Sequence, residues 1–435
     1  MRAVVATVPV LFTFGCAGVE GSRERDAMIE TLSKSGSQSR LSVEHDVAFV
    51  GGTLDRAALV TAVLARNPDL DVARETWRAT IAAYPTAAAI SDPMVTYEVA
   101  PLSIGSSVPF GQRIAISQKL PYPGKRQLAA DAVLADGEAA RADYETLRLE
   151  LAEATVVAFD DYYVAVRAID VNAHHHELIE RVQKSATAQY TVGKAAQQDP
   201  LEAEGELIAL DREHLMLATQ QREAVARINR LLRRSPEATL PAPPNKLEPA
   251  VESDETTTPH PKQIAAAARM RARASEIAGA ERAFYPDLEV MASYDSMWSD
   301  WQHQLMIGVG IEIPLQRDGR RGAVERARAE QAKAAAELVS TTDMLAEDRE
   351  RGRQQIVEAS STIELYEKRA LPNARTRVDA ALAGFTSGQN SFSSVVMAEH
   401  ALRDAELGLE QARAELDRKR AAYARASGHI AGGGR

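Results

Sequence analysis

Apolar and polar residues alternate strictly in four short segments of the chain. Residues 94–102 and 113–121 form one pair of such segments, and residues 287–295 and 304–314 form a second pair. A period of two is typical of strands, because successive side chains of a strand point to opposite faces of a sheet. The polar residues between the members of each pair are typical of hairpin loops. The pattern therefore predicts two β-hairpins.

Much longer segments carry a helical pattern. Residues 125–190 contain no proline, and a second segment runs from residue 322 to the residue before Pro372 and resumes as far as Phe385. At 1.5 Å per residue the first helix would span roughly 100 Å. In the last helix a seam broken only by Lys419 steps by four and three, which is a coiled-coil spacing. Its positions are Ala398, Leu402, Ala405, Leu409, Ala412, Leu416, Lys419 and Tyr423. Helices of this length favour a coiled coil or a helical tube.

The same order of elements occurs twice. Each copy has a helix ending in Tyr-Pro, a hairpin, a strand-to-helix exit with proline and glycine, a long helix, a turn and a return helix. We therefore expect a first repeat over residues 51–235 and a second over residues 262–428. The polar, proline-rich residues 236–261 are a linker that cannot fold alone. Residues 16–50 are a polar N-terminal segment, and residues 429–435 are a flexible tail.

The N-terminus has the layout of an export signal. Arg2 precedes an apolar run that ends before Gly15, and this run is too short to remain as a membrane-spanning helix. Cys16 is the only cysteine, which excludes an intrachain disulfide and a cysteine metal cage. Residues 1–15 are expected to be a lipoprotein-type signal peptide, cleaved before an acylated Cys16. Ordinary signal cleavage and a different start site are the alternatives.

Composition and motifs exclude several classes of function. The chain is 45% hydrophobic and 5% aromatic, with a net charge of −10, which favours a helix-rich protein and disfavours nucleic-acid binding. No nucleophile elbow, phosphate-binding loop or dinucleotide fingerprint occurs. We therefore expect no enzyme, no cofactor and no metal site.

A run of three histidines, residues 174–176, is the one motif that suggests a metal. His176 and Glu180 nearly reproduce a zinc-hydrolase pattern, but Glu180 stands where a second histidine is required. We interpret the run as a solvated helix face, with transient metal contact as the alternative.

Several motifs together resemble the TolC-type outer-membrane efflux family over about residues 50–428. They are the start of the chain with Cys16, the "RNPDL" helix opening, the "SQKLPYPGKR" exit, the turn with Tyr190 and Gly193, and the "INRLLRRSP" close. The resemblance is to outer-membrane components of heavy-metal and multidrug pumps. It implies a mainly α protein with a small β part, in which three chains of four strands close a twelve-stranded barrel continued by a helical periplasmic tube. Four strands alone could not close a barrel.

The implied function is a passive exit channel of a tripartite efflux system in the outer membrane. The resemblance implies a homotrimer in contact with outer-membrane lipid, a periplasmic adaptor (a membrane fusion protein) and an inner-membrane pump of the resistance-nodulation-division type. Metal ions or hydrophobic toxicants are the expected substrates. Two alternatives are a periplasmic coiled-coil adaptor and the outer-membrane duct of a type I protein secretion system.

The resemblance also assigns roles to the two helix turns. The tips that would meet the adaptor are Tyr190, Gly193 and Lys194 in the first repeat, and Phe385, Gly388 and Gln389 in the second. The glycines could equally serve only the backbone of the turns.

Residues just after the turns are candidates for lining the closed aperture. They are Asp199 and Glu202 in the first repeat, and Ser394 and Met397 where well-known members of the family carry aspartates. For Asp199, capping of a helix N-terminus ahead of Pro200 is the alternative.

Overall fold

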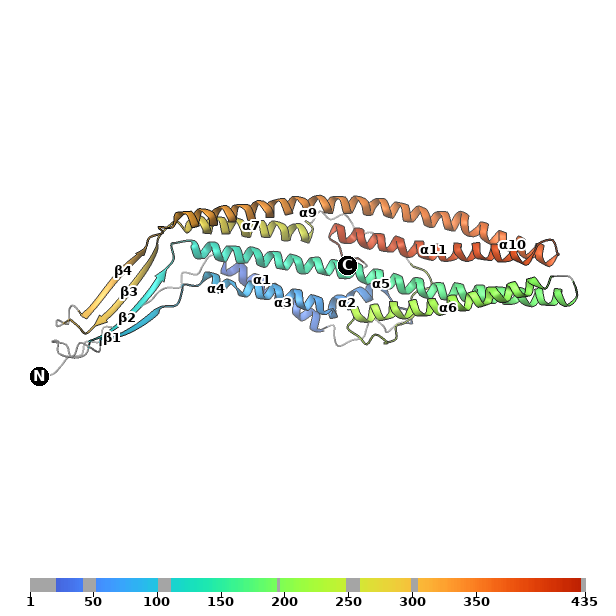
Figure 1. The fold of residues 1–435 in the computed structure, drawn as a ribbon, viewed down its shortest axis with the longest axis horizontal. Helices are drawn as coiled ribbons and strands as arrows, with labels where there is room; N and C mark the ends of the chain where they lie inside the picture. Colours follow the sequence, from blue (N-terminus) through green and yellow to red (C-terminus); the bar gives the residue numbers. More distant parts are fainter. Residues whose placement is uncertain are drawn as a thin grey trace. The chain divides into compact units, whose positions relative to one another are not determined.

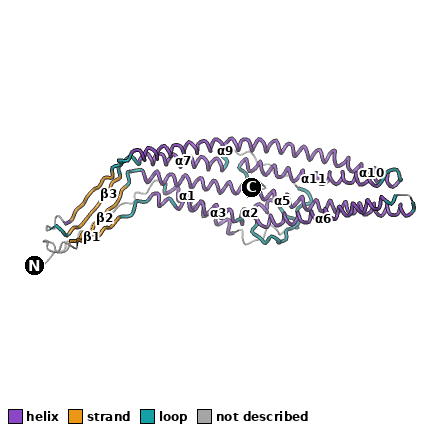
Figure 2. Tube along the Cα trace, viewed as in Figure 1, coloured by secondary structure: helices purple, strands orange, loops and turns teal. Residues whose placement is uncertain are grey.

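A computed structural model describes residues 21–41, 52–100, 111–193, 196–247, 259–298 and 304–431. The expected signal peptide, Cys16 and Lys194 lie outside the described residues. The described chain consists of helices and one small sheet (Figure 2), so the predicted mainly α architecture with a small β part is confirmed. Among the described residues, no helix combines the length and the hydropathy that a membrane span requires.

The chain divides into two compact units, and each unit draws on both sequence repeats. The first comprises the described residues within 1–31, 78–137 and 268–334, and the second comprises those within 32–77, 138–267 and 335–435. The repeats are therefore not the compact units of the fold.

The sheet lies in the first unit. It contains β1 (Met94–Ala100), β2 (Gly111–Leu120), β3 (Asp287–Asp295) and β4 (Leu305–Glu312) in this order, with every neighbouring pair antiparallel (Figure 1). Both predicted hairpins are present. They are joined by pairing of β2 with β3, so that Ile114 lies opposite Tyr294.

Short helices and the start of the long helix complete this unit. Tyr84, in α4 (Tyr84–Ala88), packs with Ala130 and Leu134 of α5 (Lys125–Thr191) and with Met28. Met28 belongs to α1 (Ser22–Leu41), a helix within the segment that the sequence marked only as polar. The guanidinium of Arg25 also lies 5.6 Å from the ring centre of Tyr84, which adds a cation–π contact. The remaining helices that contribute residues to this unit are α3 (Pro68–Ala82), α7 (Pro261–Arg282) and α9 (Arg317–Leu365).

The second unit is a helical bundle. It contains α2 (Arg56–Arg66), α6 (Gln198–Leu231), α10 (Leu371–Thr386), α11 (Phe392–Ser427) and parts of α3, α5 and α9. The predicted seam of α11 is buried from Ala398 to Ala412, and its last three positions, Leu416, Lys419 and Tyr423, are half-buried. One core cluster centres on Phe159, Tyr163 and Ile228, and another lies near the helix turns. The described part of the linker packs here too, because Leu247 joins the first cluster.

Prolines interrupt the helical patterns in two different ways. The helix predicted to end in Tyr-Pro in the first repeat is divided at Pro68 into α2 and α3. The side chain of Asn67 there accepts a hydrogen bond from the backbone N–H of Asp69 at 2.9 Å. A break was expected before Pro372, but there the chain stays helical through one π turn, Tyr366–Ala370. The wider turn leaves room for the proline ring, which cannot donate a hydrogen bond to the preceding turn. The second long helix therefore continues from α9 into α10 without the predicted break.

Candidate functional site

One face of the sheet is apolar across all four strands. The register places Val95, Ile116, Ala292 and Ile307 in one row, and Tyr97, Ile114, Tyr294 and Leu305 in the next. Because side chains alternate along a strand, both rows point to the same side of the sheet. Ile307 is 86% exposed and Tyr97 is 58% exposed. A continuous apolar surface of this kind is typical of a region that contacts a partner or lipid.

The opposite face is polar and rich in small residues. Glu98 lies opposite Arg113, with 4.0 Å between Oε2 and Nη1, and Lys119 approaches Glu312 at 3.5 Å. Gly308 and Gly310 of β4 lie on this face as well, opposite Met291 and Glu289. The sheet therefore separates an apolar side from a polar side.

The strand-to-helix exit of the first repeat is fixed by a residue of the second repeat. The Oδ1 atom of Asp287 accepts hydrogen bonds from the backbone N–H of Tyr122 and from Nζ of Lys125, both at 2.7 Å. The rings of Tyr122 and Tyr285 stack with centres 4.6 Å apart. Gly124 completes the turn with φ of +86°, and a Cβ there would overlap the guanidinium of Arg282.

The two exits share a further contact that reflects the sequence repeat. Nε of Arg126 donates to the backbone carbonyl of Ala88 at 2.7 Å, and Nε of Arg320 donates to that of Ala283 at 2.9 Å. Each arginine thus ties the start of a long helix to the segment that precedes the hairpin of the same repeat.

The two helix turns have similar backbones and different side chains. Gly193 and Gly388 have φ of +73° and +74°, the left-handed region that favours glycine. Tyr190 is 43% exposed, whereas Phe385 is 3% exposed and meets the ring of Phe392 edge-on at 5.8 Å. Gln389 is exposed. The proposed contact role of these tips stays a prediction, and for Phe385 the described packing makes the side chain part of the core.

The residues expected near the aperture are accessible to different degrees. Asp199, Glu202 and Ser394 are half-buried, and Met397 is 60% exposed. The helix that contains Asp199 is preceded by Gln197 as its N-cap residue, and no side-chain capping bond is made there among the described residues. The capping interpretation of Asp199 is therefore wrong. Asp199 instead lies in the first turn, where a negative charge suits the helix dipole.

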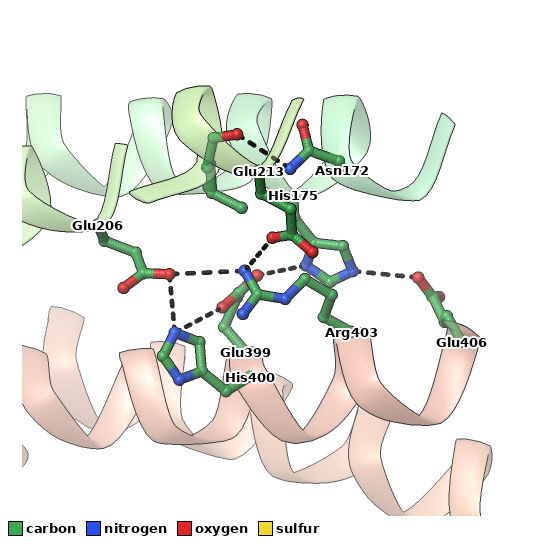
Figure 3. Close-up of polar contacts among 9 residues, drawn as sticks. Asn172, His175, Glu206, Glu213, Glu399, His400, Arg403 and Glu406 are labelled. Carbon is green, nitrogen blue, oxygen red and sulfur yellow. Dashed lines mark hydrogen bonds and ion pairs between the residues drawn. The ribbon is translucent and has the colours of Figure 1, made fainter. Parts of the chain in front are cut away.

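A buried network of charges joins α5, α6 and α11 (Figure 3). His175 of α5 is fully buried, with Nδ1 2.6 Å from Oε1 of Glu399 and Nε2 3.1 Å from Oε2 of Glu406. Burial alone would lower the pKa of His175, but the two carboxylates outweigh it and raise the pKa to about 9. His175 is therefore a cation at neutral pH.

This network corrects the interpretation of the histidine run as a solvated face. His174 is exposed and His176 lies 3.3 Å from Asp211, yet His175 is completely buried. A sequence pattern could have indicated the two carboxylates that contact His175. Glu399 and Glu406 are seven residues apart, and each follows directly after an alanine of the predicted seam. Residues seven apart lie on the same side of a helix.

A second buried carboxyl group lies at Asp160 of α5. Its side chain is fully buried, and neither carboxyl oxygen has a hydrogen-bond partner among the residues that the structure describes. Burial raises the pKa of Asp160 to about 8, although Arg418 and Arg56 act in the opposite direction. This group is consistent with a structural role.

The comparisons with known proteins agree with this fold. Residues 259–429 match the model of the outer membrane efflux protein family. The predicted resemblance to TolC-type proteins is confirmed. No curated protein matches the chain in sequence.

Solved structures match over most of the chain. The outer-membrane channel OprN is 21% identical, with a TM-score of 0.74 over 85% of this chain and 89% of that one. The outer membrane protein VceC from Vibrio cholerae is 16% identical, with a TM-score of 0.72 over 85% of this chain and 95% of that one. The MtrE outer membrane channel of Neisseria gonorrhoeae is 16% identical, with a TM-score of 0.69 over 86% and 89%. At these identities the likeness establishes the fold.

Proposed function

We propose that the protein is the outer-membrane exit channel of a tripartite efflux system. The observation that carries this proposal is the four-stranded sheet with one apolar and one polar face. A strand that crosses an outer membrane presents apolar residues to lipid and polar residues to the interior of a barrel. The described strands divide their side chains in this way.

The edges of the sheet support a trimer. β1 and β4 are its outer strands, and an open sheet edge is not tolerated in lipid. Three copies would pair β4 of one chain with β1 of the next and close a barrel of twelve strands. The long helices would form the periplasmic tube, and a lipid on Cys16 would add an anchor.

The partners are proposed from the family and the matched structures. A periplasmic adaptor would contact the turn residues Tyr190, Gly193, Lys194, Gly388 and Gln389, and an inner-membrane pump of the resistance-nodulation-division type would supply the energy. The channel itself conducts passively, with metal ions or hydrophobic toxicants as the expected cargo. The apolar sheet favours this function over a periplasmic adaptor, which has no need of a lipid-facing surface.

A matched pair of lysine substitutions tests the proposal. Ile307→Lys places a charge on the apolar face, at a cost of about 2–4 kcal/mol if the residue meets the middle of a bilayer. Ser293→Lys places the same charge on the polar face and is the control. We expect the full-length protein in outer-membrane fractions as a heat-sensitive trimer, with Ile307→Lys strongly reduced and Ser293→Lys retained. A water-soluble monomer, or equal behaviour of the two variants, would contradict the proposal.

A further inference from the structure

Three side chains with metal-binding atoms converge between α6 and α11. Glu206 comes from α6, Glu399 and His400 come from α11, and their ligand atoms all lie within 4.8 Å of one another (Figure 3). Nε2 of His400 is 2.7 Å from Oε1 of Glu206 and 3.8 Å from Oε2 of Glu399. None of the three belongs to the histidine run that the sequence singled out.

The donor set suits a divalent transition metal ion. Zinc binds imidazole nitrogen and carboxylate oxygen at about 2.0–2.2 Å, usually with four ligands in a tetrahedral arrangement. One nitrogen and two oxygens provide three such ligands, and water can supply the fourth. The ion would replace the hydrogen bond between His400 and Glu206, so only small side-chain rotations are needed.

The buried carboxylate of Glu399 is an independent indication of a ligand. Its side chain is completely buried, and Oε1 forms an ion pair with His175. Within the described part of the chain, no group donates a hydrogen bond to Oε2, the atom that faces His400. A buried carboxylate oxygen without a partner is costly, and a bound cation would satisfy it.

The surroundings hold the ligands and leave the site accessible. The side chain of His400 is 42% exposed, whereas that of Glu206 is 12% exposed, so an ion can enter from the side of His400. Arg403 lies 3.6 Å from Glu206 and also 3.6 Å from Glu213, and Glu213 can keep this arginine when Glu206 binds a cation. Nδ1 of His175 lies 2.6 Å from Oε1 of Glu399. His175 would therefore hold the orientation of this carboxylate while its other oxygen binds the ion.

We propose that Glu206, Glu399 and His400 bind a divalent transition metal ion of the zinc type, which joins α6 to α11. The bound ion would connect the return helix of the first repeat to that of the second and stabilise this bundle. This inference does not depend on the proposed channel function, because it concerns metal binding by the purified chain.

Cobalt and zinc test the site directly. The full-length protein, purified without a polyhistidine tag and stripped with a chelator, is titrated with Co²⁺ while visible absorption is recorded, and then with Zn²⁺ in competition. We expect about one ion per chain. His400→Ala and Glu206→Gln should each weaken binding by about tenfold or more, whereas His214→Ala, at an exposed histidine of α6, should bind as the wild type does.

Thermal unfolding provides a second measurement that does not rely on cobalt absorption. Zinc should raise the melting temperature of the wild type and of His214→Ala, and it should not raise that of His400→Ala. Far-UV circular dichroism of each variant establishes that it is folded. Equal zinc affinity of the wild type and His400→Ala, or an absence of cobalt binding at millimolar concentration, would overturn the proposal. Neither result would bear on the partition of the protein into the outer membrane.

Discussion

The two helix turns show how one backbone shape can serve two purposes. Both turns carry a glycine with φ near +74°, and both close a hydrogen bond from that glycine to the aromatic residue three positions earlier. In the first turn this aromatic residue, Tyr190, is 43% exposed, and in the second turn Phe385 is 3% exposed. The repeat has thus kept the chain path, while one copy uses its aromatic side chain for packing and the other presents it to the surroundings.

The largest expected difference between the turns is in stability. Phe385→Ala would leave a cavity against Phe392 in the core cluster, at a cost of about 3–5 kcal/mol. Tyr190→Ala is the matched control and should change the free energy of unfolding by less than about 0.5 kcal/mol. Denaturant unfolding followed by circular dichroism measures both, and similar losses in the two variants would contradict the described packing.

The first repeat also carries the buried acid Asp160, which makes stability depend on pH. The folded-state pKa of about 8 lies above that of an exposed aspartate, so the folded chain holds a proton that the unfolded chain has released. Stability should therefore fall as the pH rises from about 4 to about 8, by up to about 1.4 kcal/mol per pH unit from this group.

Asp160→Asn isolates this contribution, because asparagine resembles the protonated acid and does not titrate. Melting temperatures measured across this pH range should fall less steeply in Asp160→Asn than in the wild type. Parallel profiles would show that the buried carboxyl group does not set the dependence.

Alanine substitutions of the two glycines test whether the left-handed backbone conformation has the same effect on stability in both turns. Gly193→Ala and Gly388→Ala place a side chain in the left-handed region, at a cost of about 1–2 kcal/mol each. No described atom lies within 4 Å of either added Cβ, so backbone strain alone should act and the two losses should be alike. Unequal melting temperatures would reveal a contact in one turn that the other lacks.

Substitutions of exposed side chains at the two turns should change stability least, and they test contact with the proposed adaptor directly. Tyr190→Ala should leave folding intact and reduce co-purification with the proposed adaptor, because its exposed ring would be part of the interface. Gln389→Ala makes the corresponding change in the second turn. Full adaptor recovery with both variants would argue against contact at these tips.

The sequence was sufficient for elements whose pattern is local. Alternation identified all four strands, and the heptad steps identified the buried seam of α11. It could not give the pairing of β2 with β3, because that contact joins segments that are far apart in the chain. It also could not reveal that His175 is buried, since three adjacent histidines point in different directions and only the helices packed around them decide which one is enclosed.

The pairing of β2 with β3 has a consequence for how such a ring is assembled. Within one molecule it already joins the hairpin of one repeat to the hairpin of the other, and in the proposed trimer β4 and β1 of adjacent molecules would join hairpins in the same antiparallel sense. Six hairpins would then meet at six seams of a single kind, three made within chains during folding and three made between chains afterwards. Subunits would thus recognise one another through the same type of contact that each chain first makes with itself.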